Sequence, residues 1–150
     1  MTQSNNPYNW IGDDGVVSVF STNVIESRLP DSDQTGLLAG YWVERGSIDK
    51  TRMQLAGAAS TSWIGCLKDD QLELADGSYS TNQAMAIVTE GVVNTISGDS
   101  INDDTPVKLD AAGRVVTWTE GIDSIDDRVG KTLSECTAAD ETVLVKISRV

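Results

Sequence analysis

NDDTPVKLDAAGRVVTWT, residues 102–119, predicts a β-hairpin that decides the fold of this chain. Two short β-prone segments, 105–109 and 114–119, flank the four-residue loop DAAG. A loop of this length suits a type I turn closed by a residue with positive φ, which Gly113 adopts without a Cβ clash. The Asp110 carboxylate can accept hydrogen bonds from the backbone of the same turn. Nothing in the stretch is chemically reactive, so it indicates a scaffold rather than an enzyme.

Similar β-prone runs recur along the chain, separated by clusters of Gly, Asp and Ser. Apolar residues alternate in 143–147, and 92–96 is another β-branched run. No segment shows a sustained helical period, and residues 51–59 are at most one short helix or irregular. Strands and turns that alternate every 8–12 residues or so are typical of sandwiches and barrels. We therefore predict an all-β fold, a β-barrel or β-sandwich.

The chain also has a weak internal repeat. Val43 and Val107 begin similar short strands 64 positions apart, and Gly65 and Gly130, which each follow a β-branched residue, are 65 apart. Each half ends in an apolar strand, and the first copy has an insertion around 71–82. Repeats decide the architecture, so we predict an N-terminal extended arm at 1–35, a first β unit at 36–90 and a second at 91–150. Residues 36–150 can also form one compact domain.

The composition narrows the range of partners. The net charge is −12, from 23 acidic and 11 basic side chains, and such a surface repels a phosphate backbone. No apolar run approaches the roughly 20 residues that cross a bilayer, and the first residues lack the basic and apolar regions of a secretory signal. We therefore expect neither a nucleic acid nor a membrane as partner.

The residues of common active sites are missing or scattered. The chain has no histidine, which removes the usual general base and zinc ligand. Cys66 and Cys136 lack metal-ligand spacing and are best interpreted as small buried residues. Five acidic pairs, such as Asp103–Asp104, suit turns better than calcium loops or a carboxylate hydrolase. We predict no catalytic residue, no metal and no cofactor, and we assign structural turn roles to a set of four residues: Asp110, Gly113, Gly130 and Gly65.

Residues 91–150 resemble the capsid cement, or head decoration, proteins of tailed phages. The resemblance lies in TPVKLD at 105–110, GRVV at 113–116, VGKTL at 129–133 and AADETVLV at 138–145. Residues 37–90 look like a more diverged copy. The resemblance implies a non-catalytic β protein that binds the outer surface of an assembled phage head and stabilises it against the pressure of packaged DNA.

The same resemblance implies partners and a location. The major capsid protein and other copies of this chain, as a homotrimer, are the expected partners, because several joined weak contacts give avidity. The protein is expected on the outer surface of the virion, after synthesis in the host cytoplasm. Apolar residues of the N-terminal arm are candidate contacts with the capsid or a neighbouring subunit: Tyr8, Trp10, Ile11 and Phe20. Folding of these aromatics back onto their own domain is an equally good interpretation.

An alternative function needs no capsid. The chain can be a non-catalytic module of a phage tail or fibre that binds host glycans. That function requires exposed Trp or Tyr rings beside polar side chains, and the sequence does not show which of Trp42, Trp63 and Trp118 face outward.

Overall fold

The structure is a computed structural model that describes residues 23–35, 37–68 and 83–149. Within these ranges the regular structure is one antiparallel sheet of nine strands and a single 3₁₀ turn, which confirms the predicted all-β class. The strands are β1 Val24–Arg28, β2 Trp42–Arg45, β3 Met53–Leu55, β4 Trp63–Leu67, β5 Met85–Ile96, β6 Pro106–Leu109, β7 Val115–Thr117, β8 Gly130–Thr132 and β9 Thr142–Ile147. They follow the order β3-β2-β4-β5-β9-β8-β6-β7, and β1 also pairs with β5.

The predicted hairpin is formed by β6 and β7, in which Lys108 pairs with Val116. Oδ1 of Asp110 accepts hydrogen bonds from the backbone N–H groups of Ala112 and Arg114, at 2.8 and 3.0 Å. Gly113 has a φ of +72°, the left-handed conformation expected at the end of this turn. The local sequence therefore sets both the turn and the register of the hairpin.

The two halves of the sheet repeat one pairing pattern. Val43 pairs with Gly65 between β2 and β4, and Val107 pairs with Gly130 between β6 and β8. The remaining strand pairs match in the same way. Equivalent pairs are Glu44–Gln54 and Lys108–Val116, Leu67–Ile87 and Thr132–Val145, and Glu26–Ile87 and Val93–Val145. The fold is therefore built from two similar β units, as the repeat in the sequence predicted.

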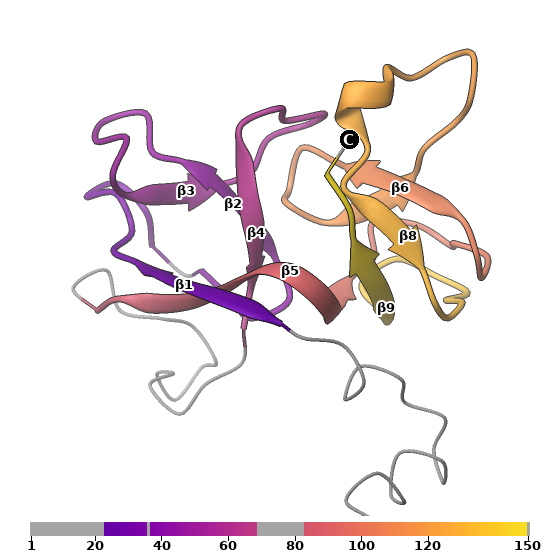
Figure 1. The fold of residues 1–150 in the computed structure, drawn as a ribbon, viewed down its shortest axis with the longest axis horizontal. Helices are drawn as coiled ribbons and strands as arrows, with labels where there is room; N and C mark the ends of the chain where they lie inside the picture. Colours follow the sequence, from indigo (N-terminus) through magenta and orange to yellow (C-terminus); the bar gives the residue numbers. More distant parts are fainter. Residues whose placement is uncertain (1–22, 36, 69–82, 150) are drawn as a thin grey trace, which may run out of the picture.

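Each unit curls until its ends meet through a parallel bridge. Pro30, after β1, bridges Met53 in β3, and the equivalent Ser97, after β5, bridges Val115 in β7. The Gly98 N–H donates to the Val115 carbonyl at 2.7 Å. Figure 1 shows the two barrel-like units side by side, with the long strand β5 running across both.

These pairings change the predicted unit boundaries. β1, which we expected within an arm, occupies in the first unit the position that the second half of β5 occupies in the second unit. Residues 24–35 thus belong to the first unit, and residues 1–22 lie outside the described residues. The boundary expected at residues 90 and 91 falls inside β5, where Gly91 has a φ of +111°. The prediction of a helix or irregular segment at 51–59 is wrong, because this region contains β3.

Two hydrophobic cores share strand β4, all of whose residues are buried. Ile64 and Leu67 pack with Val43, Met53 and other residues of the first unit. The second core lies inside the second unit and reaches across to the first, where it includes the other face of β2 and β4. The first-unit residues in this second core are Trp42, Ala56, Trp63, Cys66 and Val88. Because one core spans both units, the described part of 36–150 packs as one compact body.

Hydrogen bonds also join the units. The Trp42 indole N–H donates to Oγ1 of Thr95 at 2.7 Å, and the Thr95 hydroxyl donates to the Gly40 carbonyl at 2.8 Å. Thr95 lies in the second-unit half of β5 and is fully buried. From the other side, the Gly113 carbonyl accepts the Trp42 backbone N–H at 2.8 Å. Trp42 is therefore held by two different elements of the second unit.

Candidate binding groove

The four apolar residues predicted as contacts, Tyr8, Trp10, Ile11 and Phe20, lie outside the described residues. The structure places the other predicted residues as structural elements. Asp110 and Gly113 form the hairpin turn described above. Gly65 and Gly130 lie within strands β4 and β8 rather than in turns, which corrects their assignment. A Cβ at Gly65 would lie 2.1 Å from the Val88 carbonyl oxygen, and one at Gly130 would lie 2.2 Å from that of Lys146.

A shallow groove crosses the face on which the two units meet. It consists of three adjoining hollows of about 400, 290 and 490 Å³ that share lining residues. Trp63 and Arg149 line both the first and the second hollow, and Arg28 and Arg45 line both the second and the third. We call this surface the arginine groove; its charged lining residues are Arg28, Arg45, Lys50, Arg128, Arg149, Glu26, Glu90 and Asp126.

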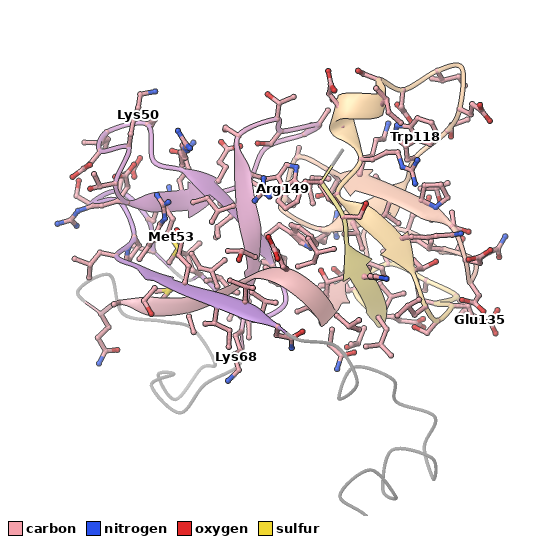
Figure 2. The ribbon with its side chains drawn as sticks, viewed as in Figure 1. Lys50, Met53, Lys68, Trp118, Glu135 and Arg149 are labelled. Atoms are coloured by element: carbon pink, nitrogen blue, oxygen red, sulfur yellow. The ribbon has the colours of Figure 1, made fainter. Side chains whose placement is uncertain are left out.

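Arg149 lies at the centre of the arginine groove, where the two units adjoin (Figure 2). Its guanidinium stacks 3.9 Å from the centroid of the Trp63 ring and donates to the carbonyls of Trp63 and Ile64, at 3.3 and 2.7 Å. Partial burial lowers the pKa of Arg149 from its usual value; the nearby Glu90 and Glu26 oppose this shift, and Arg45 adds to it. The side chain still carries its charge at neutral pH, because an arginine pKa starts far above 7.

The arginines of the chain divide into two groups. Arg28, Arg52 and Arg114 form salt bridges with carboxylates. Within the ranges that the structure describes, Arg45, Arg128 and Arg149 form none, and all three line the arginine groove. Arg128 instead lies 5.2 Å from the centroid of the Trp118 ring. The three arginines without a salt bridge thus lie on one surface of a chain of net charge −12, and Glu90 and Glu26 on the same surface act electrostatically on Arg149.

The tryptophans in and near the groove are buried or half-buried. Trp42 and Trp63 are buried and pack edge to face, with centroids 5.3 Å apart and an interplanar angle of 76°. The Arg149 guanidinium covers the Trp63 ring, and the indole N–H of Trp118 donates to the Ser124 carbonyl at 2.7 Å. These rings form packing contacts rather than an open platform for a sugar.

Other polar groups predicted as candidates have structural partners. Asp104 pairs with Lys131 at 2.7 Å, and the buried Asp31 accepts the backbone N–H groups of Ile48 and Asp49. Cys66 and Cys136 are buried free thiols, as expected, and burial raises the pKa of Cys66 to about 12. Among the residues placed by the structure, no group of three or more His, Cys, Asp or Glu side chains is arranged to hold a metal ion.

The described residues also contain no helix that is long and apolar enough to cross a membrane. Compared with known proteins, the chain matches no family model and no curated protein sequence.

The sequence-based predictions missed the arginine groove. Arg45 and Arg128 are 83 positions apart, and each stands in a polar context that suits a solvated surface. The clearest hint in the sequence was the excess of acidic residues, which makes an arginine without a carboxylate partner unusual.

Proposed function

We propose that this protein is a structural, non-catalytic binding protein that attaches to the outer surface of an assembled tailed-phage head and stabilises the shell. The resemblance to capsid cement proteins supports the proposal. Its motif residues fall on β6, the hairpin turn, β8 and β9, which together form most of one complete unit. The strands of the first unit pair in the same register as those of the second. This similarity supports the interpretation of residues 37–90 as a more diverged copy.

The observation that carries the proposal is the arginine groove, an open binding surface that spans both units. Three guanidinium groups without carboxylate partners line it. Arg45 and Arg149 are exposed and Arg128 is half-buried, so their N–H donors are accessible to a partner that carries carboxylates. The fold around the groove is tied together by the shared core and by the Trp42–Thr95 hydrogen bond, so the groove is presented on a preorganised scaffold.

The proposed mechanism of stabilisation is avidity. A homotrimer that contacts several shell subunits must break all its contacts together before the shell expands, so weak single contacts give a slow release. The strong negative charge suits a protein displayed in many copies, because like charges keep decorated particles apart. Trp42 and Trp63 are buried, and the half-buried Trp118 has Arg128 against its ring, so these tryptophans do not favour the glycan-binding alternative.

The test is a binding titration on undecorated capsids of the phage that encodes the protein. Purified protein is added at increasing concentration, and the bound amount is measured after sedimentation. The proposal predicts saturable binding with a fixed number of copies per capsid, and DNA release from filled heads at a higher temperature after decoration. Absence of saturable binding would contradict it.

A further inference from the structure

We propose that the arginine groove binds an extended segment of the shell protein that carries spaced carboxylate side chains. The identity of the partner rests on the proposed function; the chemistry of the ligand rests on the groove alone. Arg45 and Arg128 offer planar groups of N–H donors that match a carboxylate in two parallel hydrogen bonds.

The distribution of charge favours carboxylates on a peptide over a phosphate polymer. Glu26, Glu90 and Asp126 lie along the arginine groove between the basic side chains. A nucleic acid strand places a negative charge at every nucleotide, so it would meet these three carboxylates as well as a chain of net charge −12. A peptide can place its carboxylates at Arg45 and Arg128 and neutral or basic residues elsewhere.

The shape of the groove favours an extended segment. Its three hollows adjoin in a row, from Lys50 and Thr51 in the first unit to Arg128 in the second. Figure 2 shows Lys50 near one end of the molecule and Arg149 in the middle of the same view. An extended chain can contact successive hollows, whereas a single compact ligand would occupy one of them.

The first experiment measures ligand chemistry without capsids. The probe is a fluorescent 12-residue peptide of alternating Glu and Ser, compared with a Gln–Ser peptide and a single-stranded DNA oligonucleotide by fluorescence anisotropy. The variant Arg45→Gln/Arg128→Gln removes two groove charges that form no salt bridge with the described residues. Lys146→Gln is the control substitution because Lys146 is exposed on β9 and does not line the groove. Arg149 is left unchanged because it packs on Trp63. Melting temperatures verify that each variant is folded.

We expect the Glu–Ser peptide to bind the wild-type protein and Lys146→Gln with similar affinity, and to bind the double variant at least tenfold more weakly. Binding should weaken with added salt. The inference is overturned if the Gln–Ser peptide binds equally well, if the oligonucleotide binds more tightly than the Glu–Ser peptide, or if the double variant binds like the wild type.

The second experiment separates this inference from the proposed function. The same three proteins are titrated onto undecorated capsids, and their oligomeric state is measured by sedimentation. If the wild type decorates capsids and the double variant decorates them equally well, the groove inference fails and the function stands. If the wild type does not bind capsids but binds the Glu–Ser peptide through Arg45 and Arg128, the proposed function is contradicted and the proposed ligand chemistry is supported. A change in oligomeric state alone would assign the groove to self-association and overturn the inference.

Discussion

The Asp31 carboxylate lies against Gly46 so closely that a Cβ on this glycine would come within 2.4 Å of Oδ2. The equivalent pair in the second unit is Gly98 and Asp110, and a Cβ on Gly98 would come within 2.4 Å of the Asp110 carboxylate. In both units the carboxylate accepts backbone N–H groups of the first hairpin turn. Each unit thus has one carboxylate at the equivalent place in its fold. In the first unit Asp31 supplies it and faces Gly46, whereas in the second unit Asp110 supplies it and faces Gly98.

This exchange of Asp and Gly between the two units predicts that a second substitution can restore the stability lost by a first one. Asp31→Gly should lower the free energy of unfolding by about 2–3 kcal/mol, because two turn N–H groups lose a charged acceptor. Adding Gly46→Asp should restore part of this loss by copying the second unit, whereas Gly46→Asp alone should destabilise because two carboxylates would compete for one space. Urea unfolding measures all three variants. A double variant less stable than Asp31→Gly would show that the two positions are not equivalent.

Gly113 and Gly121 separate backbone conformation from packing. Both have positive φ, but a Cβ at Gly113 would lie 2.7 Å from Leu55 Cδ1 and 2.9 Å from the Trp42 carbonyl oxygen, whereas a Cβ at Gly121 would have no neighbour within 4 Å. Gly121→Ala should cost about 1 kcal/mol of folding free energy from backbone strain alone, and Gly113→Ala clearly more. Equal losses in thermal unfolding would mean that the β6–β7 turn does not pack against the first unit.

Thr95→Val tests the hydrogen bonds that join the units. Valine keeps the shape but leaves the Trp42 indole N–H without its acceptor, whereas the Gly40 carbonyl still accepts the Ile96 backbone N–H, so we expect a loss of about 1–3 kcal/mol. Thr95→Ser keeps the hydroxyl and should cost less. Unfolding followed by tryptophan fluorescence gives both values, and a neutral Thr95→Val would contradict the role of this bridge.

Asp123 predicts a pH dependence of stability. Its hydrogen bond with the Lys108 ammonium, supported by the Thr119 backbone N–H, lowers the pKa of the Asp123 carboxyl below its usual value of 3.8. Because the folded state favours the ionised form, this contribution is fully present above the unfolded pKa and is lost as pH falls through the lower, folded pKa. Asp123→Asn should therefore destabilise the protein similarly at pH 7 and 5, and progressively less below about pH 4.

Urea unfolding at several pH values measures this difference, and Glu120→Gln in the same loop controls for the change in net charge. A cost of Asp123→Asn that grows on acidification would contradict the sign of the shift.

The sequence alone was sufficient where the signal is local. Asp110 and Gly113 define their turn within four residues, and the spacings of Val43 to Val107 and Gly65 to Gly130 coincide with equivalent pairs in the sheet. β1 was missed as part of the first unit because its residues are mostly exposed and show no buried face. Its place depends on pairing with β5, about 60 positions away, which no local pattern encodes.

The arginine groove depends on the same long-range pairings. Arg45 ends β2, Arg128 precedes β8 and Arg149 follows β9, so only the folded sheet brings them to one surface. Charged residues at the ends of strands are ordinary in solvent-exposed loops. These arginines differ from the others in that they form no salt bridge. This difference can be recognised only in the folded structure, where Arg28, Arg52 and Arg114 pair with carboxylates.

The proposed function places the arginine groove of this protein against the shell of a phage head. A density map of capsids saturated with the wild-type protein tests it most directly. We predict ordered copies on the outer surface, with Arg45 and Arg128 in contact with a carboxylate-bearing segment of the shell. Capsids without added density, or bound copies whose groove faces solvent, would contradict it.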